Sequence, residues 1–474
     1  LNRETMKSFC FIVFICTTAR PARLLGTEIG SDLPQKIGAA LEKRKLRAEI
    51  IAHDAPINDT AKGLIILAPE NPEADFNLFA FQLLQRAADT LKRAGKDSAS
   101  ILLSVTRLGG AFGFEALSRS SPISGGLAGL LKTADKEWEN VHCKALDIPA
   151  NRSSVKLATT IVDEALTQGP LETGIKDDGL CYLSLNTSMV EDSALETNPF
   201  GTDDVIIITG GARGVTAEVA VAMAQSFNTH LLLLGRSPLP SPEAKYLSGI
   251  NEEAAIKKTI VAYHAGEKLA PADVQEAYRK ILANREITDN IKRMEDCGVG
   301  VLYQSVDVRD KSALSDAIKK ARNELGNIAG IIHGAGVLAD RLIEDKTMEQ
   351  FQQVYSTKVD GLQAMLEICD KDKLKVIALF SSLTARLGRK GQVDYAMANE
   401  VLNKIAQQQE RLRRDCRVLS VNWGPWDGGM VTPQLKQLFE SEGVGVISLK
   451  GGADYLSQEI STLLEKKEQK NSDG

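Results

Sequence analysis

The sequence has few of the features from which metal sites, disulfide frameworks and membrane spans are built. Its seven cysteines are odd in number and never form C-x-x-C, and its five histidines show no H-E-x-x-H spacing. These absences argue against a disulfide framework and against zinc, so we expect no metal and a reducing, cytoplasmic compartment. No apolar run reaches about 18 residues, which excludes a multispan membrane protein.

A large net charge of either sign is also missing. The chain has 57 Lys+Arg and 62 Asp+Glu, a net charge of −5, with 43% hydrophobic residues. This apolar fraction predicts a folded protein and excludes a disordered one. The mild acidity, without a long basic run, argues against a nucleic-acid binder. A length of 474 residues predicts about three average domains, or fewer large α/β units.

The N-terminal segment Phe9–Cys16 has two interpretations. Its apolar residues predict a first strand buried on both faces. The same run follows Lys7 and precedes small residues, which is also typical of a short signal peptide. The chain begins with Leu1 and not with Met, which indicates a piece of a longer polypeptide.

Short apolar runs alternate with amphipathic segments along the whole chain, a pattern that predicts βαβ units with parallel sheets. In the first half the predicted strands are Phe9–Cys16, Glu49–Ile51, Gly63–Ala68, Ile101–Val105, His142–Asp147 and Leu180–Leu185, and the predicted helices are Leu78–Ala94, Gly125–Trp138 and Ser154–Thr167. The polar stretch Glu191–Asp204 is typical of a linker. In the second half the predicted strands are Val205–Thr209, His230–Gly235, Val299–Ser305, Ile328–His333, Val376–Ser381 and Val418–Asn422, and the predicted helices are Ser312–Leu325, Thr347–Cys369 and Tyr395–Arg413.

The segment TGGARGVT follows the first strand of the second half and precedes a helical pattern. Glycines there allow a tight turn against a pyrophosphate at the positive end of the next helix. Thr216 stands where a further glycine would be usual, and the alternative is a plain strand–helix turn. The candidate cofactor-binding residues of this turn are Thr209, Gly210, Gly211, Ala212, Arg213, Gly214 and Val215.

The next strands end where a dinucleotide site would need them. Arg236 and Ser237 end the second strand, and an arginine there pairs with the 2′-phosphate of NADP, although a solvated arginine is the alternative. The third and fourth strands end with Asp307 and Val308, and with Gly334, Ala335, Gly336 and Val337. Together these residues predict NADPH as the cofactor.

With FSSLTARLGRKGQVDYAMAN, STKVDGL and NWGPWDGGM, the second half resembles the short-chain dehydrogenase/reductase superfamily, and specifically the ketoreductase domains of polyketide synthases. Ser382 and Tyr395 lie thirteen residues apart, Asn399 follows Tyr395 by four, and Lys358 stands where these domains carry their lysine. The turn and the long insertion are similar to ketoreductases of polyunsaturated-fatty-acid-type synthases.

The resemblance implies two consecutive doubly wound Rossmann-like units of the α/β class. Residues 1–198 would be a degenerate structural subdomain, in which TRLGGAFG is a structural turn, and residues 199–474 the catalytic, cofactor-binding one. Residues 238–296 exceed a plain βα unit and are interpreted as an inserted helical excursion on the surface.

The resemblance also implies reduction of a carrier-bound β-ketoacyl thioester. Tyr395 would donate a proton, Lys358 would lower the pKa of Tyr395 and hold the nicotinamide ribose, Ser382 would hydrogen-bond the oxyanion, and Asn399 would position Lys358 or a relay water. The implied substrate-binding residues are Asp340, Ser381, Leu383, Gln392, Trp423, Gly424, Pro425, Trp426 and Met430. The implied partners are an acyl carrier protein bearing phosphopantetheine and neighbouring synthase domains, without nucleic acid or membrane.

Two alternatives to this function remain open: a free-standing NADP-dependent reductase of a small ketone, and a catalytically silent structural domain, which Thr216 keeps open. For the reductase, Leu338-Ala339-Asp340 and the absence of tryptophan at Leu379 predict a (3R)-hydroxy product. Ala339 and Met397 depart from the pattern of (3R)-producing domains.

Overall fold

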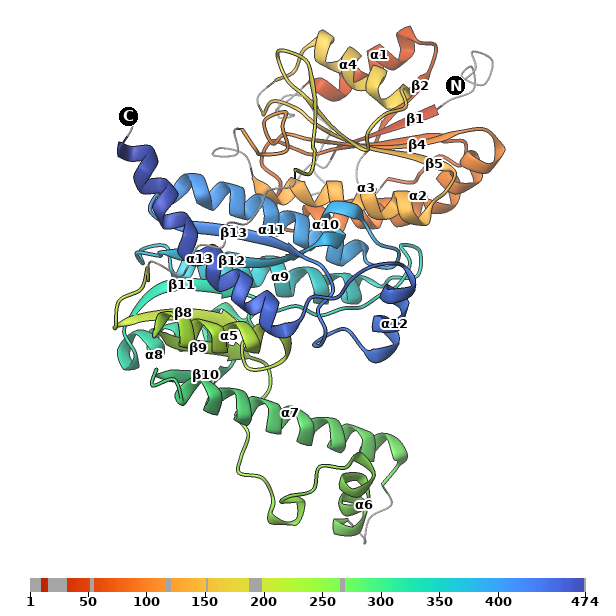
Figure 1. Cartoon of the computed structure of the whole chain (residues 1–474). Coiled ribbons are helices and arrows are strands. Elements are labelled where there is room, and N and C mark those ends of the chain that lie inside the picture. Colours follow the sequence, from red (N-terminus) through yellow and green to blue (C-terminus); the bar gives the residue numbers. More distant parts are fainter. Residues whose placement is uncertain are drawn as a thin grey trace.

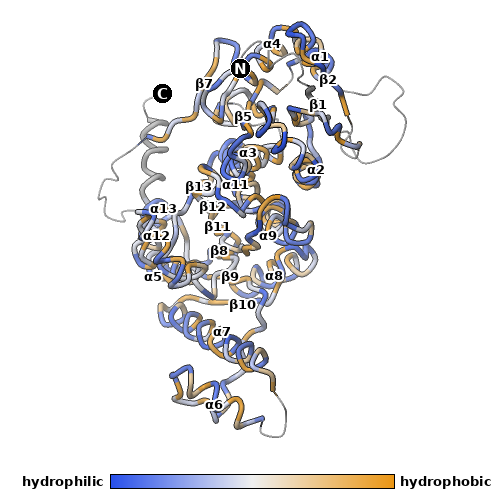
Figure 2. The backbone as a smooth tube through the Cα atoms, turned by 90° about the vertical axis from the view of Figure 1, so that its right-hand side faces the viewer, coloured by the Kyte–Doolittle hydropathy of each residue, from blue (hydrophilic) through white to orange (hydrophobic). Residues whose placement is uncertain are grey.

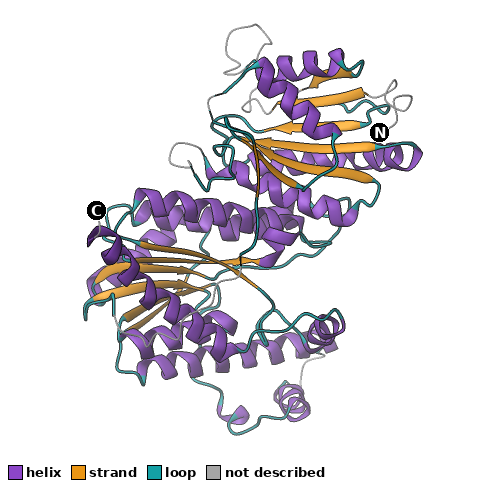
Figure 3. Cartoon of the chain, turned by 45° about the horizontal axis from the view of Figure 1, so that its top comes forward, coloured by secondary structure: helices purple, strands orange, loops and turns teal. Residues whose placement is uncertain are grey.

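The computed structural model describes residues 10–15, 32–51, 55–115, 121–150, 152–186, 198–264 and 269–472. Its strands form two sheets with helices between them and on their outer faces (Figures 1 and 3). The predicted α/β class with largely parallel sheets is confirmed. The N-terminal part of the predicted linker, residues 191–197, lies outside the described residues, and Asp204 already belongs to a strand.

The first sheet has the order β2-β1-β3-β4-β5-β6-β7. Its strands are β1 (Cys10–Ile15), β2 (Arg47–Ile51), β3 (Gly63–Leu67), β4 (Ser100–Thr106), β5 (Val141–Asp147), β6 (Glu172–Ile175) and β7 (Leu180–Tyr182). Helices α1 (Leu33–Lys43) and α4 (Val155–Leu166) cover one face, and α2 (Phe76–Asp97) and α3 (Gly126–Glu137) cover the other. Alternate residues of β3 enter different cores: Leu64 and Ile66 pack with α2 and α3, and Ile65 and Leu67 with α1 and α4.

One edge of this sheet differs from the prediction. Strand β6 was not expected, and β7, within the predicted strand Leu180–Leu185, pairs with it antiparallel. The connection is a tight turn in which Lys176 N–H donates to the Gly179 carbonyl at 2.8 Å. So short a connection cannot cross over to a parallel neighbour.

The second sheet is entirely parallel, in the order β10-β9-β8-β11-β12-β13. Its strands are β8 (Asp204–Thr209), β9 (His230–Gly235), β10 (Val301–Ser305), β11 (Asn327–His333), β12 (Val376–Ser382) and β13 (Arg417–Trp423). Helices α8 (Lys311–Glu324), α9 (Met348–Ile368) and α11 (Val393–Leu412) cover one face, and α5 (Gly214–Phe227) and α13 (Leu449–Ser472) the other. The short helices α10 (Leu383–Leu387) and α12 (Pro433–Ser441) follow β12 and β13. No helix in the described part of the chain is long and apolar enough to cross a membrane.

The two halves share one apolar core. Helix α3 packs on α11 so closely that a Cβ on Gly129 would lie 2.6 Å from the backbone of Ala396. The rings of Phe81 and Phe351 stack at 4.6 Å, and Asn77 donates to the Tyr355 hydroxyl at 2.7 Å. These contacts hold the halves together as one packed body (Figure 1).

A buried ion network crosses the same interface. Lys132 of α3 contacts Glu400 of α11 at 2.6 Å and Glu172 of β6 at 2.9 Å. Arg386 of α10 contacts both carboxylates, and Lys404 lies 3.8 Å from Glu400. Burial opposes the ionised form, yet Lys132, Lys404 and Arg386 outweigh it and hold the pKa of Glu400 below its usual range.

The segment predicted as a helical excursion carries a 3₁₀ turn (Lys245–Leu247), α6 (Glu253–Tyr263) and the long α7 (Pro271–Glu295). Residues 265–268 are not among the described ones. Its outer part forms a small core of its own around Leu247, Ile256 and Ile260, and α6 lies at the end of the molecule farthest from the first half (Figure 2). The inner part of α7 packs on α5 (Figure 1).

Candidate active site

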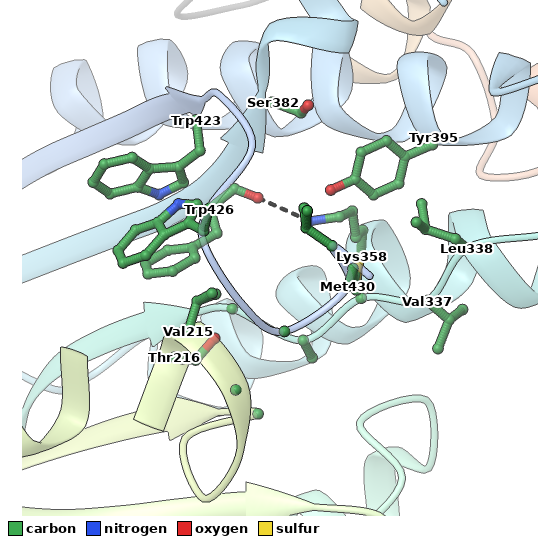
Figure 4. A pocket seen from close by; sticks show the side chains of 18 of the residues that line it. Val215, Thr216, Val337, Leu338, Lys358, Ser382, Tyr395, Trp423, Trp426 and Met430 are labelled. Carbon is green, nitrogen blue, oxygen red and sulfur yellow. Dashed lines mark hydrogen bonds between the residues drawn. The ribbon is translucent and has the colours of Figure 1, made fainter. Parts of the chain in front are cut away.

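A cavity of about 820 Å³ opens at the carboxyl ends of β8, β9, β11, β12 and β13. It extends from the glycine-rich turn before α5 to the loop after β13, and Figure 4 shows Lys358, Ser382 and Tyr395 at one part of it, with Val215 and Thr216 at another. Three of the four predicted catalytic residues and all nine predicted substrate-binding residues line this cavity. Asn399 is buried behind it.

The glycine-rich turn has the backbone that a phosphate-binding turn requires. Gly210 and Gly214 have φ values of +76° and +62°, where a side chain would be strained. Thr216, which replaces the usual glycine, packs beside Gly334: a Cβ on Gly334 would lie 2.5 Å from the Thr216 hydroxyl oxygen. The threonine therefore fills space left by Gly334 without displacing the turn.

Most predicted cofactor-binding residues line the cavity: Gly210, Arg213, Gly214, Val215, Arg236, Asp307, Val308, Gly334, Ala335, Gly336, Val337, Lys358 and Tyr395. Thr209, Gly211, Ala212 and Ser237 do not. Gly211 packs on Ile208 and Leu233, Ala212 is buried, and the Ser237 carbonyl accepts from the Tyr303 hydroxyl at 2.6 Å. These residues pack on the side of the glycine-rich turn and of the end of β9 that faces away from the cavity.

Two guanidinium groups line one end of the cavity. Arg236 directly follows β9, and Arg213 lies in the turn before α5. Arg309 pairs with Asp307 at 2.6 Å, and this hydrogen bond lowers the pKa of the Asp307 carboxyl. Arg236 also lowers it through its charge. The positive charge suits an anionic group such as a phosphate.

Tyr395, on the first turn of α11, is the central titratable group. Burial raises the pKa of its phenol above the ordinary value of 10.0, and the side chains of Asn399 and then Ser382 partly offset this. The Ser382 hydroxyl oxygen accepts from Thr384 N–H at 3.1 Å, which leaves its own proton free to donate. The phenol is therefore protonated near neutral pH.

Lys358 of α9 is buried beside the tyrosine. Its Nζ lies 5.3 Å from the centre of the Tyr395 ring and donates to the Phe380 carbonyl at 2.8 Å (Figure 4). Burial lowers the pKa of Lys358 to about 7. Burial also dominates the pKa of Tyr395 and raises it, and the lowering of that pKa by Lys358 stays a prediction.

Asn399 lies one turn after Tyr395 on α11, and its hydrogen bonds go to Tyr395 and Ser381 and not to Lys358. Its Nδ2 donates to the Tyr395 carbonyl at 2.8 Å, and its carbonyl accepts from the Ser381 hydroxyl at 3.2 Å. Its Oδ1 is buried and has no hydrogen-bond partner within the described residues. Such an orphaned oxygen fits a bound water.

Several contributors were missed by reasoning from the sequence, among them His333 and Phe439. His333, the last residue of β11, is fully buried and bridges Thr209 Oγ1 and the Lys358 carbonyl, each at 2.9 Å. Burial and the nearby charge of Lys358 lower its pKa to about 3, so it is neutral and ties β8 to α9. Helix α12 adds Phe439, whose ring lies 4.9 Å from the Arg389 guanidinium across the substrate end. The only sequence signal for His333 is a polar residue ending an apolar strand.

Comparisons with known proteins match this chain to a ketoreductase family and to synthases. The family model described as KR domain matches residues 205–428. The chain is 33% identical over 461 residues to a polyunsaturated fatty acid synthase polypeptide of Thraustochytrium sp., covering 90% of this chain and 16% of that protein. It is 24% identical over 416 residues to polyketide synthase PksN of Bacillus subtilis, covering 86% of this chain and 6% of that one. The chain thus spans a small part of these relatives.

Solved structures show the same fold. A structure of an A1-type ketoreductase matches with a TM-score of 0.70 at 20% identity, over 96% of this chain and 87% of that chain. A ketoreductase domain from the bacillaene assembly line matches with a TM-score of 0.64 at 20% identity, over 96% and 90%.

Proposed function

Residues 205–428 belong to the KR domain family, and from this premise we propose that the chain reduces a carrier-bound β-ketoacyl thioester to a β-hydroxyacyl thioester with NADPH. The observation that carries the proposal is one cavity that joins the glycine-rich turn to Lys358, Ser382 and Tyr395. If the glycine-rich turn had no role in cofactor binding, there would be no reason for Lys358, Ser382 and Tyr395 to face the cavity that the turn lines.

The residues present fit a dinucleotide. Gly210 and Gly214 form a cradle in the left-handed region before α5, and a Cβ on Gly336 would lie 3.2 Å from Lys358 Cε, so a side chain there would crowd Lys358. Arg236, at the adenosine end, would hold the 2′-phosphate. When bound, NADPH supplies the hydride.

The protein's own residues supply the proton for the ketone oxygen and stabilise the negative charge that develops on it. Tyr395 donates its proton to the ketone oxygen, and the Ser382 hydroxyl donates a hydrogen bond to the same oxygen as charge develops on it. Lys358 would hold the nicotinamide ribose. Its positive charge would stabilise the Tyr395 phenolate that remains after proton transfer. The orphaned Asn399 Oδ1 supports a relay water as the source of the next proton.

The substrate end is built by the loop after β13. Trp423 and Trp426 pack edge to face at 4.8 Å, and Gln392 donates to Asp340 at 3.0 Å on the opposite wall. Asp340 lines this end of the cavity, whereas Leu379 is buried in the core, and the (3R)-hydroxy product predicted from these two positions is part of the proposal. The relatives are multidomain synthases, which supports a carrier protein with a phosphopantetheine arm and neighbouring synthase domains as partners.

We also propose the division of labour predicted from the sequence: residues 1–198 as a scaffold and 199–474 as the catalytic subdomain. The carboxylate of Asp147 supports the first role, because it accepts from Leu108 N–H at 2.6 Å and Phe112 N–H at 2.7 Å. Two amides of the TRLGGAFG turn are thereby occupied by the chain itself. Residues 202–474 expressed alone should aggregate or lack activity, and a soluble, fully active fragment would contradict the scaffold role.

The proposal is tested by comparing substrates. NADPH oxidation is followed with a β-ketoacyl N-acetylcysteamine thioester and with a small bicyclic ketone, and the product is identified by mass spectrometry. Turnover with preference for the thioester supports the proposal. Preference for the small ketone favours the free-standing reductase, and turnover of neither favours a silent domain.

A further inference from the structure

Helix α7 of the excursion is fixed against the turn that precedes α5. Asn290 Nδ2 donates to the Ala212 carbonyl in that turn at 3.2 Å, and Ile287 is buried against the core that α5 shares. Arg293 forms two hydrogen bonds, of 2.7 and 2.9 Å, to the carboxylate of Glu218 on α5. The position of α7 next to the turn is therefore defined by apolar, polar and charged contacts (Figure 1).

Glu286, one residue before Ile287, reaches from this helix into the turn. Its Oε1 accepts from the Gly214 N–H at 2.8 Å, and its Oε2 accepts from Arg213 Nε at 3.0 Å. Glu286 also lines the cavity. One carboxylate thus engages both an amide at the start of α5 and the cation beside it.

These two donors are of the kind that binds phosphate. The N–H groups at the start of a helix carry partial positive charge, and a guanidinium pairs with phosphate through charge-assisted hydrogen bonds. A carboxylate that holds both donors competes with an anionic ligand for them. The Arg213 and Glu286 side chains are 49% and 40% exposed, so the pair is weak enough to be exchanged.

We infer that Glu286 is an affinity-determining residue of the cofactor site, whose carboxylate competes with the phosphate groups of NADPH for Gly214 N–H and Arg213 and so weakens cofactor binding. The inference rests on the proposed function in one respect, namely that the cavity binds NADPH. The inference assigns the helical excursion a role in cofactor binding, because its helix α7 carries the competing carboxylate of Glu286.

The test measures binding without turnover. Isothermal titration calorimetry with NADPH is performed on the full chain and on Glu286→Gln, in which the amide oxygen still accepts from Gly214 N–H while the charge is lost. We expect NADPH to bind about two- to fivefold more tightly to Glu286→Gln, the effect of losing one exposed ion pair. Glu286→Ala also frees the Gly214 N–H and should bind NADPH about five- to thirtyfold more tightly.

The matched control is Glu243→Gln. Glu243 belongs to the same excursion and pairs with Arg285 at 2.6 Å, next to Glu286 in sequence, but is not part of the cavity wall. Its substitution changes the net charge equally and should leave the affinity unchanged.

Unchanged or weaker binding by Glu286→Gln overturns the inference and leaves the proposed function standing. Equal tightening in Glu243→Gln also overturns it, because the effect would then be one of overall charge. No binding by any of the proteins overturns the inference and the cofactor assignment together.

Discussion

The buried network between the halves predicts an unequal response to loss of one charge. Five side chains share it, the cations Lys132, Arg386 and Lys404 and the carboxylates Glu172 and Glu400, and their side chains are at most 17% exposed. Glu400→Gln leaves three cations with Glu172 alone, so the free energy of unfolding should fall by about 3–5 kcal/mol. Lys132→Met leaves two cations with two carboxylates, and the loss should be smaller, about 1–3 kcal/mol.

The assay is urea unfolding followed by tryptophan fluorescence. Trp138 reports on the first half, and Trp423 and Trp426 on the second. Lys450→Met, which removes an exposed partner of Asp454, is the control and should leave the free energy of unfolding unchanged.

The pH dependence supplies a second check on the same variant. Because the folded-state pKa of Glu400 lies below its usual value of 4.5, the advantage of the wild type over Glu400→Gln is fully present above pH 4.5. It shrinks as the pH falls below that value. A loss below about 1 kcal/mol in Glu400→Gln, or an equal loss in Lys132→Met, would refute the argument from charge balance.

Three further predictions concern the active site. Arg236→Ala should lower the NADPH-over-NADH preference about ten- to a hundredfold in kcat/KM, since one charge-assisted contact to the 2′-phosphate is lost, and an unchanged ratio would show that the phosphate is read elsewhere. Burial lowers the pKa of Lys358 to about 7, so kcat/KM should fall as the pH rises above that value while the lysine loses its proton. Lys358→Met should lack this limb of the pH profile, and its persistence would assign the limb to another group. Chiral chromatography of the reduced thioester should give mainly the (3R) alcohol, and mainly 3S product would show that Leu379 and Asp340 do not set the face.

The fold was predictable where local sequence decides structure. Most strands of the second half contain a continuous apolar run bounded by polar residues, and all six formed close to the predicted positions. Strand β6 was missed because its sequence, ETGI, is short and only partly apolar. Its pairing with β7 depends on the turn between them, and its Glu172 is held by Lys132 of the first half and Arg386 of the second.

The part of the candidate site that lies at the ends of strands was predictable from the sequence. Residues that close a strand or a turn were found, because parallel strands bring their carboxyl ends to one edge. Contributions from distant segments were not. Glu286 lies 72 residues from Gly214, and Lys132 lies 268 residues from Glu400, so only the packing of helices brings these pairs together.

The most direct test of the proposed reaction compares the wild type with Tyr395→Phe. NADPH consumption with a β-ketoacyl thioester is measured for both proteins, and NADPH affinity is measured by calorimetry to show that the cofactor site is intact. The proposed mechanism predicts unchanged affinity and a rate at least about a hundredfold lower in the variant, because the phenol that donates the proton is gone. Near-normal turnover in Tyr395→Phe would contradict it.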